Sequence, residues 1–311
     1  MRGCVLALSG GVGGAKLALG LRRVLPNGAL TIAANTGDDF IHLGLHVSPD
    51  LDTLLYTLSG LANEEIGWGR RDETWTFMEA LKSLGGETWF RLGDGDLATH
   101  VERTRRLAGG ESLSSITDDF RRRLGIHARL LPMTDDKVMT RLLTDEGWLD
   151  FQDYFVRLQA RPVVRAIRYE GAAAARPQPD VLALIADPVL RLVVICPSNP
   201  FLSIDPILAL PGLRQALADC PAPVVAVSPI IGGRAIKGPT AKIMGELGLS
   251  VDAATVARHY HDILDLYIAD EADAGTFGDL GLPVRFTRTL MTSLDDREAL
   301  ARAVLAAADG L

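Results

Sequence analysis

The stretch Ala7-Leu8-Ser9-Gly10-Gly11-Val12-Gly13-Gly14-Ala15-Lys16 decides the fold of this chain. An apolar run, residues 4–8, precedes the glycines, and a segment with leucines at positions 17, 21 and 25 follows them. This order predicts a buried strand, a tight turn and a helix. Glycines let the backbone approach a ligand closely, and the first turn of a helix offers unpaired N–H groups to an anion. We therefore expect the turn to bind phosphate.

Two well-known phosphate-binding fingerprints do not fit this stretch. A dinucleotide-binding G-x-G-x-x-G that starts at Gly11 would require glycine where Lys16 stands, and a P-loop would require its lysine directly after a glycine. Lys16 instead lies between Ala15 and Leu17. The sequence therefore supports neither a nicotinamide site nor a standard NTPase site. A turn that only lets the helix pack closely on the strand is the alternative to a ligand site.

The composition is that of an ordinary globular protein. The chain has 311 residues, of which 48% are hydrophobic and 23% charged, enough for one large domain or two smaller ones. No apolar run approaches the length of a membrane span, and the net charge of -7 argues against a nucleic-acid-binding surface. Three scattered cysteines are typical of reduced thiols, so we expect a cytoplasmic protein.

Arginines cluster at three places, and acidic residues are interspersed among them. The clusters lie at residues 70–71, 103–106 and 121–123. For the second and third clusters we expect solvated helix faces.

Two acidic turns follow the glycine turn. A second buried strand, residues 30–34, runs out at a turn that contains Asp38 and Asp39, and a later turn contains Asp50 and Asp52. Ligands of an open parallel sheet sit beyond the carboxyl ends of its strands, so both turns should lie beside the glycine turn. One aspartate could cap the following helix. A cap explains four aspartates poorly, whereas Mg²⁺ favours carboxylates together with phosphate oxygens.

Residues 60–126 have a helical pattern and carry Trp68, Trp75 and His100. We expect them to form an insertion that covers the site, between the two parts of a nucleotide-binding core, residues 1–59 and 127–311. Tryptophans in such a segment are more often core residues than ligand contacts, and a single histidine there is unremarkable.

The second half of the chain alternates strand-like and helix-like segments. Strand candidates at residues 190–196, 224–227, 263–268 and 284–286 are interspersed with helical patterns, and an alanine-rich helix is expected at residues 294–308. The prediction is an α/β fold with a Rossmann-like, doubly wound, mainly parallel sheet and a helical insertion. Residues 129–133 and 138–143 are expected to form a short hairpin, and residues 171–179 an exposed loop.

Two loops of this half are candidates to hold a nucleotide. The first, residues 197–206, contains Ser198 and Asn199, and the second, residues 228–239, contains Arg234 and Lys237. Both follow predicted strands, so they should lie at the same edge of the sheet as the glycine turn.

Taken together, these segments resemble the 2-phospho-L-lactate transferase family of coenzyme F420 biosynthesis, including its actinobacterial members that use phosphoenolpyruvyl donors. The resemblance rests on matching stretches at residues 9–16, 35–39, 49–57, 67–75, 92–100, 197–206 and 228–238. It implies a reaction in which a GDP-linked three-carbon acid donates its phospho-acid group to the ribityl hydroxyl of the deazaflavin Fo, releasing GMP. It also implies Mg²⁺ dependence and a homodimer.

Candidate roles follow for the residues of these motifs. We expect Asp38, Asp39 and Asp52 to bind Mg²⁺ or orient the hydroxyl, with Asp50 as a further metal ligand. The remaining candidates are expected to contact the donor or Fo: Gly10, Gly11, Gly13, Gly14, Lys16, Ser198, Asn199, Lys237, Trp68, Trp75 and His100.

Two other functions compete with this one. A non-catalytic, nucleotide-sugar-binding regulatory protein with a related glycine loop would share the fold, but it would have no need of a deazaflavin pocket. A nicotinamide oxidoreductase is disfavoured because the dinucleotide fingerprint fails at Lys16.

Overall fold

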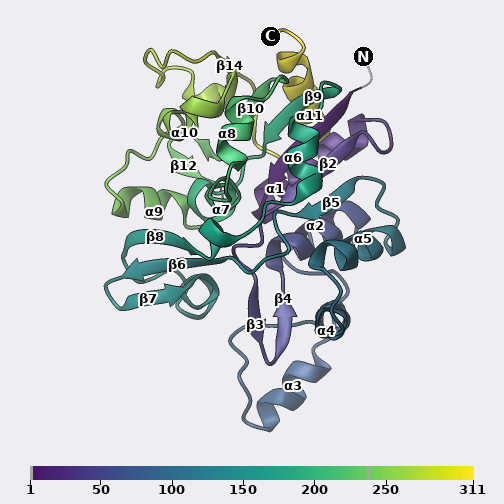
Figure 1. Ribbon diagram of the computed structural model, residues 1–311. Helices are drawn as coiled ribbons and strands as arrows, with labels where there is room; N and C mark the ends of the chain where they lie inside the picture. The colour runs from purple at the N-terminus through teal and green to yellow at the C-terminus, as the bar shows by residue number, and fades with distance from the viewer. Residues whose placement is uncertain (1–2, 237) are drawn as a thin grey trace.

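The computed structural model describes residues 3–236 and 238–311. Its centre is a seven-stranded sheet in which neighbouring strands are parallel, and the two chain ends lie at the same end of the molecule (Figure 1). The strands, in sheet order, are β14 (Val284–Phe286), β13 (Leu266–Ala269), β10 (Val224–Val227), β9 (Leu190–Ile195), β1 (Cys4–Ser9), β2 (Leu30–Ala34) and β5 (Arg129–Pro132). The predicted fold class is confirmed.

Helices cover both faces of this sheet, because its strands are apolar on both sides. Successive residues of β1 pack into different clusters: Leu6 and Leu8 into one, Val5 and Ala7 into the other. The cluster of Val5 includes residues of α1 (Gly11–Val24), α2 (Pro49–Ser59), α5 (Leu113–Arg123) and α11 (Leu294–Ala308). The cluster of Leu6 includes residues of α6 (Pro179–Ile185), α7 (Asp205–Leu208), α8 (Leu213–Ala218), α9 (Thr240–Glu246) and α10 (Ala253–His259).

The order of the strands places a crevice between β1 and β9. From β1 the chain moves outward through β2 to β5, then returns to β9 and moves outward in the opposite direction. Connections that leave neighbouring strands on opposite sides open a crevice at the carboxyl ends, where open α/β sheets bind their ligands. The glycine turn after β1 and the loop after β9 meet there.

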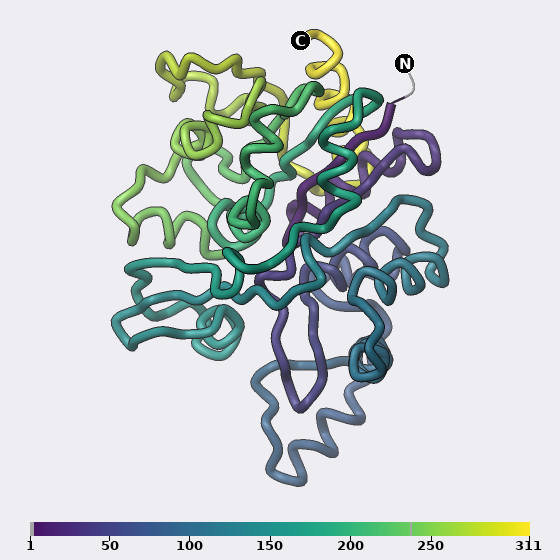
Figure 2. The backbone as a smooth tube through the Cα atoms, in the orientation of Figure 1, coloured from purple at the N-terminus to yellow at the C-terminus, as the bar shows by residue number. Residues whose placement is uncertain are grey.

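A second region extends away from the chain ends (Figures 1 and 2). It contains the hairpin of β3 (Phe40–His42) and β4 (Leu45–Val47), and the helices α3 (Thr76–Ser83) and α4 (Asp94–Ala108). A hydrogen bond from the His46 amide to Thr104 Oγ1, 2.7 Å long, joins the hairpin to α4. The two helices are locked by reciprocal caps, since Asp94 accepts from the amides of Thr76 and Phe77, and Glu73 accepts from the amides of Gly95 and Asp96.

The prediction of a hairpin formed by residues 129–133 and 138–143 is wrong. Its first half is β5, which pairs with β2 and buries Leu130 and Leu131 on opposite faces of the sheet. Its second half is β6 (Met139–Thr144), which forms a separate antiparallel sheet with β7 (Gly147–Asp150) and β8 (Val164–Glu170). Thr134 turns the chain between them: its hydroxyl accepts from the Asp136 amide at 3.0 Å and donates to the Arg176 carbonyl at 2.7 Å.

The segment expected as an exposed loop at residues 171–179 is partly buried. It forms a short 3₁₀ turn, Ala172–Ala174, and both Ala172 and Ala175 pack into the core. Shorter elements complete the fold: π-helical turns at Asp153–Arg157 and Pro200–Ile204, 3₁₀ turns at His261–Ile263 and Glu271–Asp273, and a hairpin of β11 (Ile230–Ile231) and β12 (Arg234–Ala235). Among the residues described, no helix is both long and apolar enough to cross a membrane.

Candidate active site

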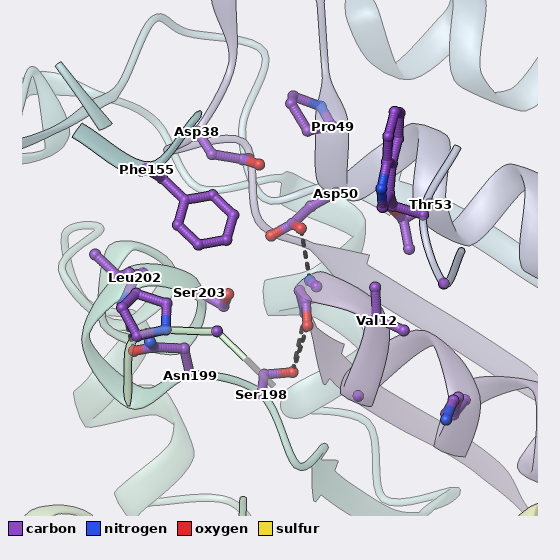
Figure 3. Close-up of a pocket in the computed structure, with 18 of the residues that line it drawn as sticks. Val12, Asp38, Pro49, Asp50, Thr53, Phe155, Ser198, Asn199, Leu202 and Ser203 are labelled. Atoms are coloured by element: carbon purple, nitrogen blue, oxygen red, sulfur yellow. Dashed lines mark hydrogen bonds between the residues drawn. The ribbon is translucent and has the colours of Figure 1, made fainter. Parts of the chain in front are cut away.

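A cavity of about 660 Å³ opens at the carboxyl ends of β1, β9 and β10. The glycine turn, both acidic turns and the loops after β9 and β10 contribute to its wall, and so do α4 and the π-helical turn at Asp153–Arg157. In Figure 3, Asp38, Asp50, Phe155 and Ser203 lie around one open space, and Val12 lies to the right of it. The tertiary structure thus gathers segments from the whole chain around the start of α1.

The start of α1 already holds a carboxylate. The Gly11 amide donates to Asp50 Oδ1 at 2.6 Å, and the Gly10 amide donates to Ser198 Oγ at 3.1 Å (Figure 3). Helical geometry leaves the amides of Val12 and Gly13 without an acceptor inside the helix, and both residues line the cavity. The positive end of the helix dipole therefore stabilises Asp50 and still offers two donors to an anion.

The glycines of the turn meet two different needs. A Cβ on Gly13 would collide with the Pro197 carbonyl oxygen, and one on Gly14 would collide with Ser9 and Ser198. Gly11 has φ +63° and more room around it. Close packing against the loop after β9 thus explains why glycine stands at positions 13 and 14, which is the alternative that the sequence left open beside close approach of a ligand. The left-handed backbone explains Gly11.

Asp38 and Asp50 form a buried carboxylate pair in the cavity wall. Asn35 connects them, because its Nδ2 donates to Asp50 Oδ2 at 3.0 Å and lies 3.3 Å from Asp38 Oδ1. Burial and the neighbouring carboxylates of Asp50 and Asp39 raise the pKa of Asp38 well above its usual range. Burial also raises the pKa of Asp50 to about 6, although hydrogen bonds from Asn35 and Gly11 oppose the shift. The pair therefore has more acceptor oxygens than hydrogen-bond donors, and a bound cation would compensate its negative charge.

Asp39 and Asp52 have different partners from that pair, although burial also raises the pKa of Asp39 well above its usual range, against the opposing effects of Ser48 and Arg103. Asp39 does not line the cavity; its Oδ2 accepts from Ser48 Oγ at 2.7 Å and lies 3.8 Å from His46 Nε2. Asp52 lines the cavity, but both of its oxygens bind the guanidinium of Arg103, with a distance of 3.1 Å from Nη1 to Oδ2. The structure thus leaves Asp38 and Asp50 as the carboxylates best placed to bind a metal.

Arg103 corrects the expectation of solvated arginine clusters. The side chains of Arg105, Arg122 and Arg123 are exposed as expected, whereas Arg103 is only 1% exposed. The side chains of Arg106 and Arg121 are also largely covered, at 12% and 16% exposure, and are paired with acidic residues. It lies on the face of α4 that packs against Asp52. The sequence did carry a signal for this, because Arg103 follows His100 by three positions, so both share one helix face.

A polar network continues from Arg103 along α4. His100 is 1% exposed, with Nδ1 3.3 Å from Arg103 Nη1 and Nε2 3.1 Å from Asp96 Oδ2. Tyr56 donates to Asp96 Oδ1 at 2.6 Å. Burial would raise the pKa of Asp96, but His100 and the Tyr56 hydroxyl outweigh it and lower the pKa. Tyr56, Asp96 and His100 all line the cavity, and sequence reasoning missed the first two.

The residues expected on the nucleotide side are mostly at the cavity. Ser198 and Asn199 line it; Asn199 Oδ1 accepts from the amides of Phe201 and Leu202, while its buried Nδ2 has no partner among the described residues. Arg234 is exposed and does not line the cavity, and Lys237 lies outside the described residues.

Lys16 joins the cavity to a segment that the sequence did not single out. Its Nζ donates to the Met291 carbonyl at 2.8 Å, and Thr289, Leu290 and Met291 line the cavity. Asp270, just after β13, holds this segment by accepting from the amide and hydroxyl of Thr289.

The two candidate tryptophans lie in different places. Trp68 lines the cavity and is 48% exposed. Trp75 lines only a smaller neighbouring pocket of about 170 Å³, under the guanidinium of Arg91, which lies 4.0 Å from the centre of its ring. Aromatic residues that sequence reasoning did not select complete the cavity wall: Trp89, Phe90, Phe151 and Phe155.

Within residues 3–236 and 238–311, no group of three or more His, Cys, Asp or Glu side chains is arranged to hold a metal ion. A protein-only metal centre is therefore not evident in the described part of the chain. Mg²⁺ needs less than this, since it commonly takes one or two carboxylates and completes its shell with water and substrate phosphate. The pair of Asp38 and Asp50 fits that requirement.

Comparison with known proteins points in one direction. The sequence profile of the 2-phospho-L-lactate transferase CofD family matches residues 5–277. The phosphoenolpyruvate transferases of Streptomyces griseus and Kitasatospora aureofaciens are 42% and 43% identical, each over 98% of this chain and 98% of the relative. The 2-phospho-L-lactate transferase of Methanosarcina mazei is 39% identical over 97% of this chain and 100% of its own length.

A solved structure shares the fold. A UPF0052 family protein of Bacillus halodurans superimposes with a TM-score of 0.63 at 15% identity, covering 98% of this chain and 99% of that chain. At this identity the likeness concerns the arrangement of the chain only.

Proposed function

The chain belongs to the 2-phospho-L-lactate transferase family and is a transferase, and we propose that it transfers the phosphorylated form of a three-carbon acid to the deazaflavin Fo. The transferred group is phosphoenolpyruvyl or 2-phospholactyl, the donor is its GDP-linked form, and the acceptor is the ribityl hydroxyl of Fo. GMP leaves, and the product enters the biosynthesis of coenzyme F420. One observation carries the proposal: the start of α1, with Asp50 bound to its Gly11 amide, and the neighbouring Asp38 line one cavity together with Val12 and Gly13.

This combination of backbone amides and carboxylates suits transfer of a group from a diphosphate. A new bond forms from the hydroxyl oxygen to the phosphorus that carries the acid, the bond from this phosphorus to the phosphate oxygen of GMP breaks, and the hydroxyl proton passes to water. Such reactions depend on alignment and on stabilising the charge that develops on the phosphate oxygens. The amides of Val12 and Gly13 would bind phosphate oxygens, and Lys16, anchored on Met291, would add positive charge beside them.

Asp38 and Asp50 would hold Mg²⁺. The ion, when bound, would neutralise charge on the diphosphate. Burial raises the pKa of both carboxyl groups, and the neighbouring Asp50 and Asp39 raise that of Asp38 further, so a divalent cation would favour their charged forms. Asn35 would keep the two side chains at a fixed separation, because it is hydrogen-bonded to Asp50 and close to Asp38.

The acceptor would occupy the part of the cavity nearest the second region. Trp68, Trp89 and Phe90 provide apolar surface there, and Tyr56 and His100 provide polar groups. A flat, largely apolar tricycle requires this combination.

Product mass tests the proposal. The protein is incubated with Fo, Mg²⁺ and each GDP-linked donor in turn, and the products are analysed by mass spectrometry. We expect GMP and one phosphodiester of Fo, and the mass of that product identifies the three-carbon acid. Binding of nucleotide without release of GMP from any donor would contradict the proposal and favour a regulatory binding protein.

A further inference from the structure

Arg103 occupies an unusual position for an arginine. Its side chain is among the largest fully buried ones in the described part of the chain, and it lies behind the cavity wall rather than in it. Removing a guanidinium from water is costly, and a buried ion pair often adds little to stability compared with apolar packing. Stability alone is therefore a weak reason for placing arginine here.

The contacts of Arg103 connect three segments of the site. Its guanidinium binds both oxygens of Asp52 on α2, lies 3.3 Å from His100 Nδ1 on α4, and reaches the His46 carbonyl on β4 at 3.5 Å. His46 does not compete as a cation, since burial, followed by the charge of Arg103, lowers the pKa of His46 to about 4. Arg103 thus supplies a buried positive charge where the acidic turn, the hairpin and α4 meet.

These contacts also define the proton position on His100. Every N–H of an arginine side chain is a donor, so the 3.3 Å contact of Nη1 with His100 Nδ1 is a hydrogen bond only when Nδ1 accepts and carries no proton. Asp52 Oδ2, the acceptor that would favour a proton on Nδ1, lies farther away, at 3.7 Å. The proton of a neutral imidazole is then on Nε2, which lies 3.1 Å from Asp96 Oδ2 but does not meet hydrogen-bond geometry with it. Tyr56 donates to the other oxygen of Asp96. The donor direction at His100 Nδ1 is therefore set by Arg103.

We propose that Arg103 is a positioning residue of this site, which orients Asp52 and fixes the Nε2–H tautomer of His100, so that both side chains are held in the cavity wall. Its effect on turnover rests on the proposed function, whereas its effect on His100 does not.

The first test is spectroscopic. Protein with ¹⁵N-labelled histidine is measured by NMR, and a His100→Gln variant identifies the His100 signal. We expect the Nε2–H tautomer in the unmodified protein and a mixture of tautomers in Arg103→Met. Arg105→Met is the matched control, because Arg105 lies on the same helix with its side chain 69% exposed, and it should leave the signal unchanged. A Nδ1–H tautomer, or the same tautomer in Arg103→Met, would overturn the proposal.

The second test separates positioning from stability. Arg103→Met leaves Asp52 buried without its partner, so we expect Tm to fall by about 10 °C. The double variant Arg103→Met/Asp52→Asn removes both charges and should recover most of that loss. Turnover should remain reduced by about 100-fold in kcat in the double variant, with KM for the GDP-linked donor changed less than about threefold. Arg103→Lys, which keeps the charge but not the paired N–H groups, should recover turnover only in part.

The outcomes distinguish the two proposals. Recovery of both Tm and kcat in the double variant would show that Arg103 is only structural and would overturn the positioning role. Absence of transfer by the unmodified protein, with the His100 signature as expected, would contradict the proposed function and support the positioning of His100.

Discussion

Two groups of aspartates line the cavity, Asp38 with Asp50, and Asp52 alone, and their buried carboxylates have different partners. Asp38 and Asp50 line the cavity and both lie within hydrogen-bond distance of the Asn35 side-chain amide, and Asp50 also accepts from the Gly11 backbone amide. Their pKa values are raised. Asp52, two positions after Asp50 on the same helix, is paired with a buried arginine. Identical side chains in one motif can therefore have different surroundings: Asp52 is paired with a buried cation, whereas Asp38 and Asp50 are the carboxylates that we propose to hold Mg²⁺.

The largest expected difference between these groups is catalytic. Asp50→Asn and Asp38→Asn should each reduce turnover by a factor on the order of 10³, because they remove the carboxylates proposed to hold Mg²⁺. In the absence of metal the same changes should raise Tm, since each removes a buried carboxylate with a raised pKa. Steady-state GMP release and thermal unfolding measure the two effects. Full activity in both variants would remove the metal assignment.

The opposite stability effect is expected at Asp52. Asp52→Asn leaves the Arg103 guanidinium buried without a carboxylate, which typically reduces the free energy of unfolding by about 3–5 kcal/mol. Chemical denaturation of this variant beside Asp50→Asn makes the comparison directly. Equal stability of the two variants would mean that the buried ion pair does not distinguish the two groups of aspartates.

The pH dependence of stability should also differ. A carboxyl group with a raised pKa in the folded state binds protons more tightly there, so its contribution is fully present below the unfolded pKa and is lost as pH rises to about 6. For Asp50 the change is on the order of 3 kcal/mol, since one pKa unit corresponds to about 1.4 kcal/mol. Metal-free protein should therefore lose stability between about pH 4 and pH 6 relative to Asp50→Asn. Parallel curves for the two proteins would contradict this.

The smallest expected effect concerns the aromatic end of the cavity. Trp68→Leu should weaken Fo binding about tenfold while leaving GDP affinity and Tm nearly unchanged, because Trp68 lines the cavity and is half exposed. Trp75→Leu should have a smaller effect, of about threefold, through the Arg91 side chain that rests on its ring. Trp148→Leu is the matched control, since its ring lies under Arg168 and away from the cavity. Fluorescence titration with Fo measures all three, and a larger loss in Trp75→Leu than in Trp68→Leu would reverse the assignment.

Local sequence patterns predicted most strands of the sheet, but they did not predict which strands pair when the partners lie far apart in the chain. The apolar runs of β1, β2, β9 and β10 were found because strands buried on both faces are continuously apolar. The hairpin at residues 129–143 was wrong because two neighbouring strands can pair elsewhere, and no local feature states that β5 joins β2. The sequence named four aspartates as metal candidates and chose Asp38, Asp39 and Asp52 as catalytic, but it could not foresee that Asp39 does not line the cavity and that Asp52 binds Arg103.

The sequence by itself determined the parallel α/β fold, the glycine turn at the start of α1, the acidic turns beside it and the family to which the chain belongs. These depend on residue type, on periodicity and on motifs of a few residues, which are local properties. The tertiary structure alone decided that Asp50 caps the first helix, that Asp52 is neutralised by Arg103, and that Trp68 reaches the cavity while Trp75 does not. The charge and pKa of a carboxylate depend on burial and on partners that lie far apart in the chain, and only folding brings these together.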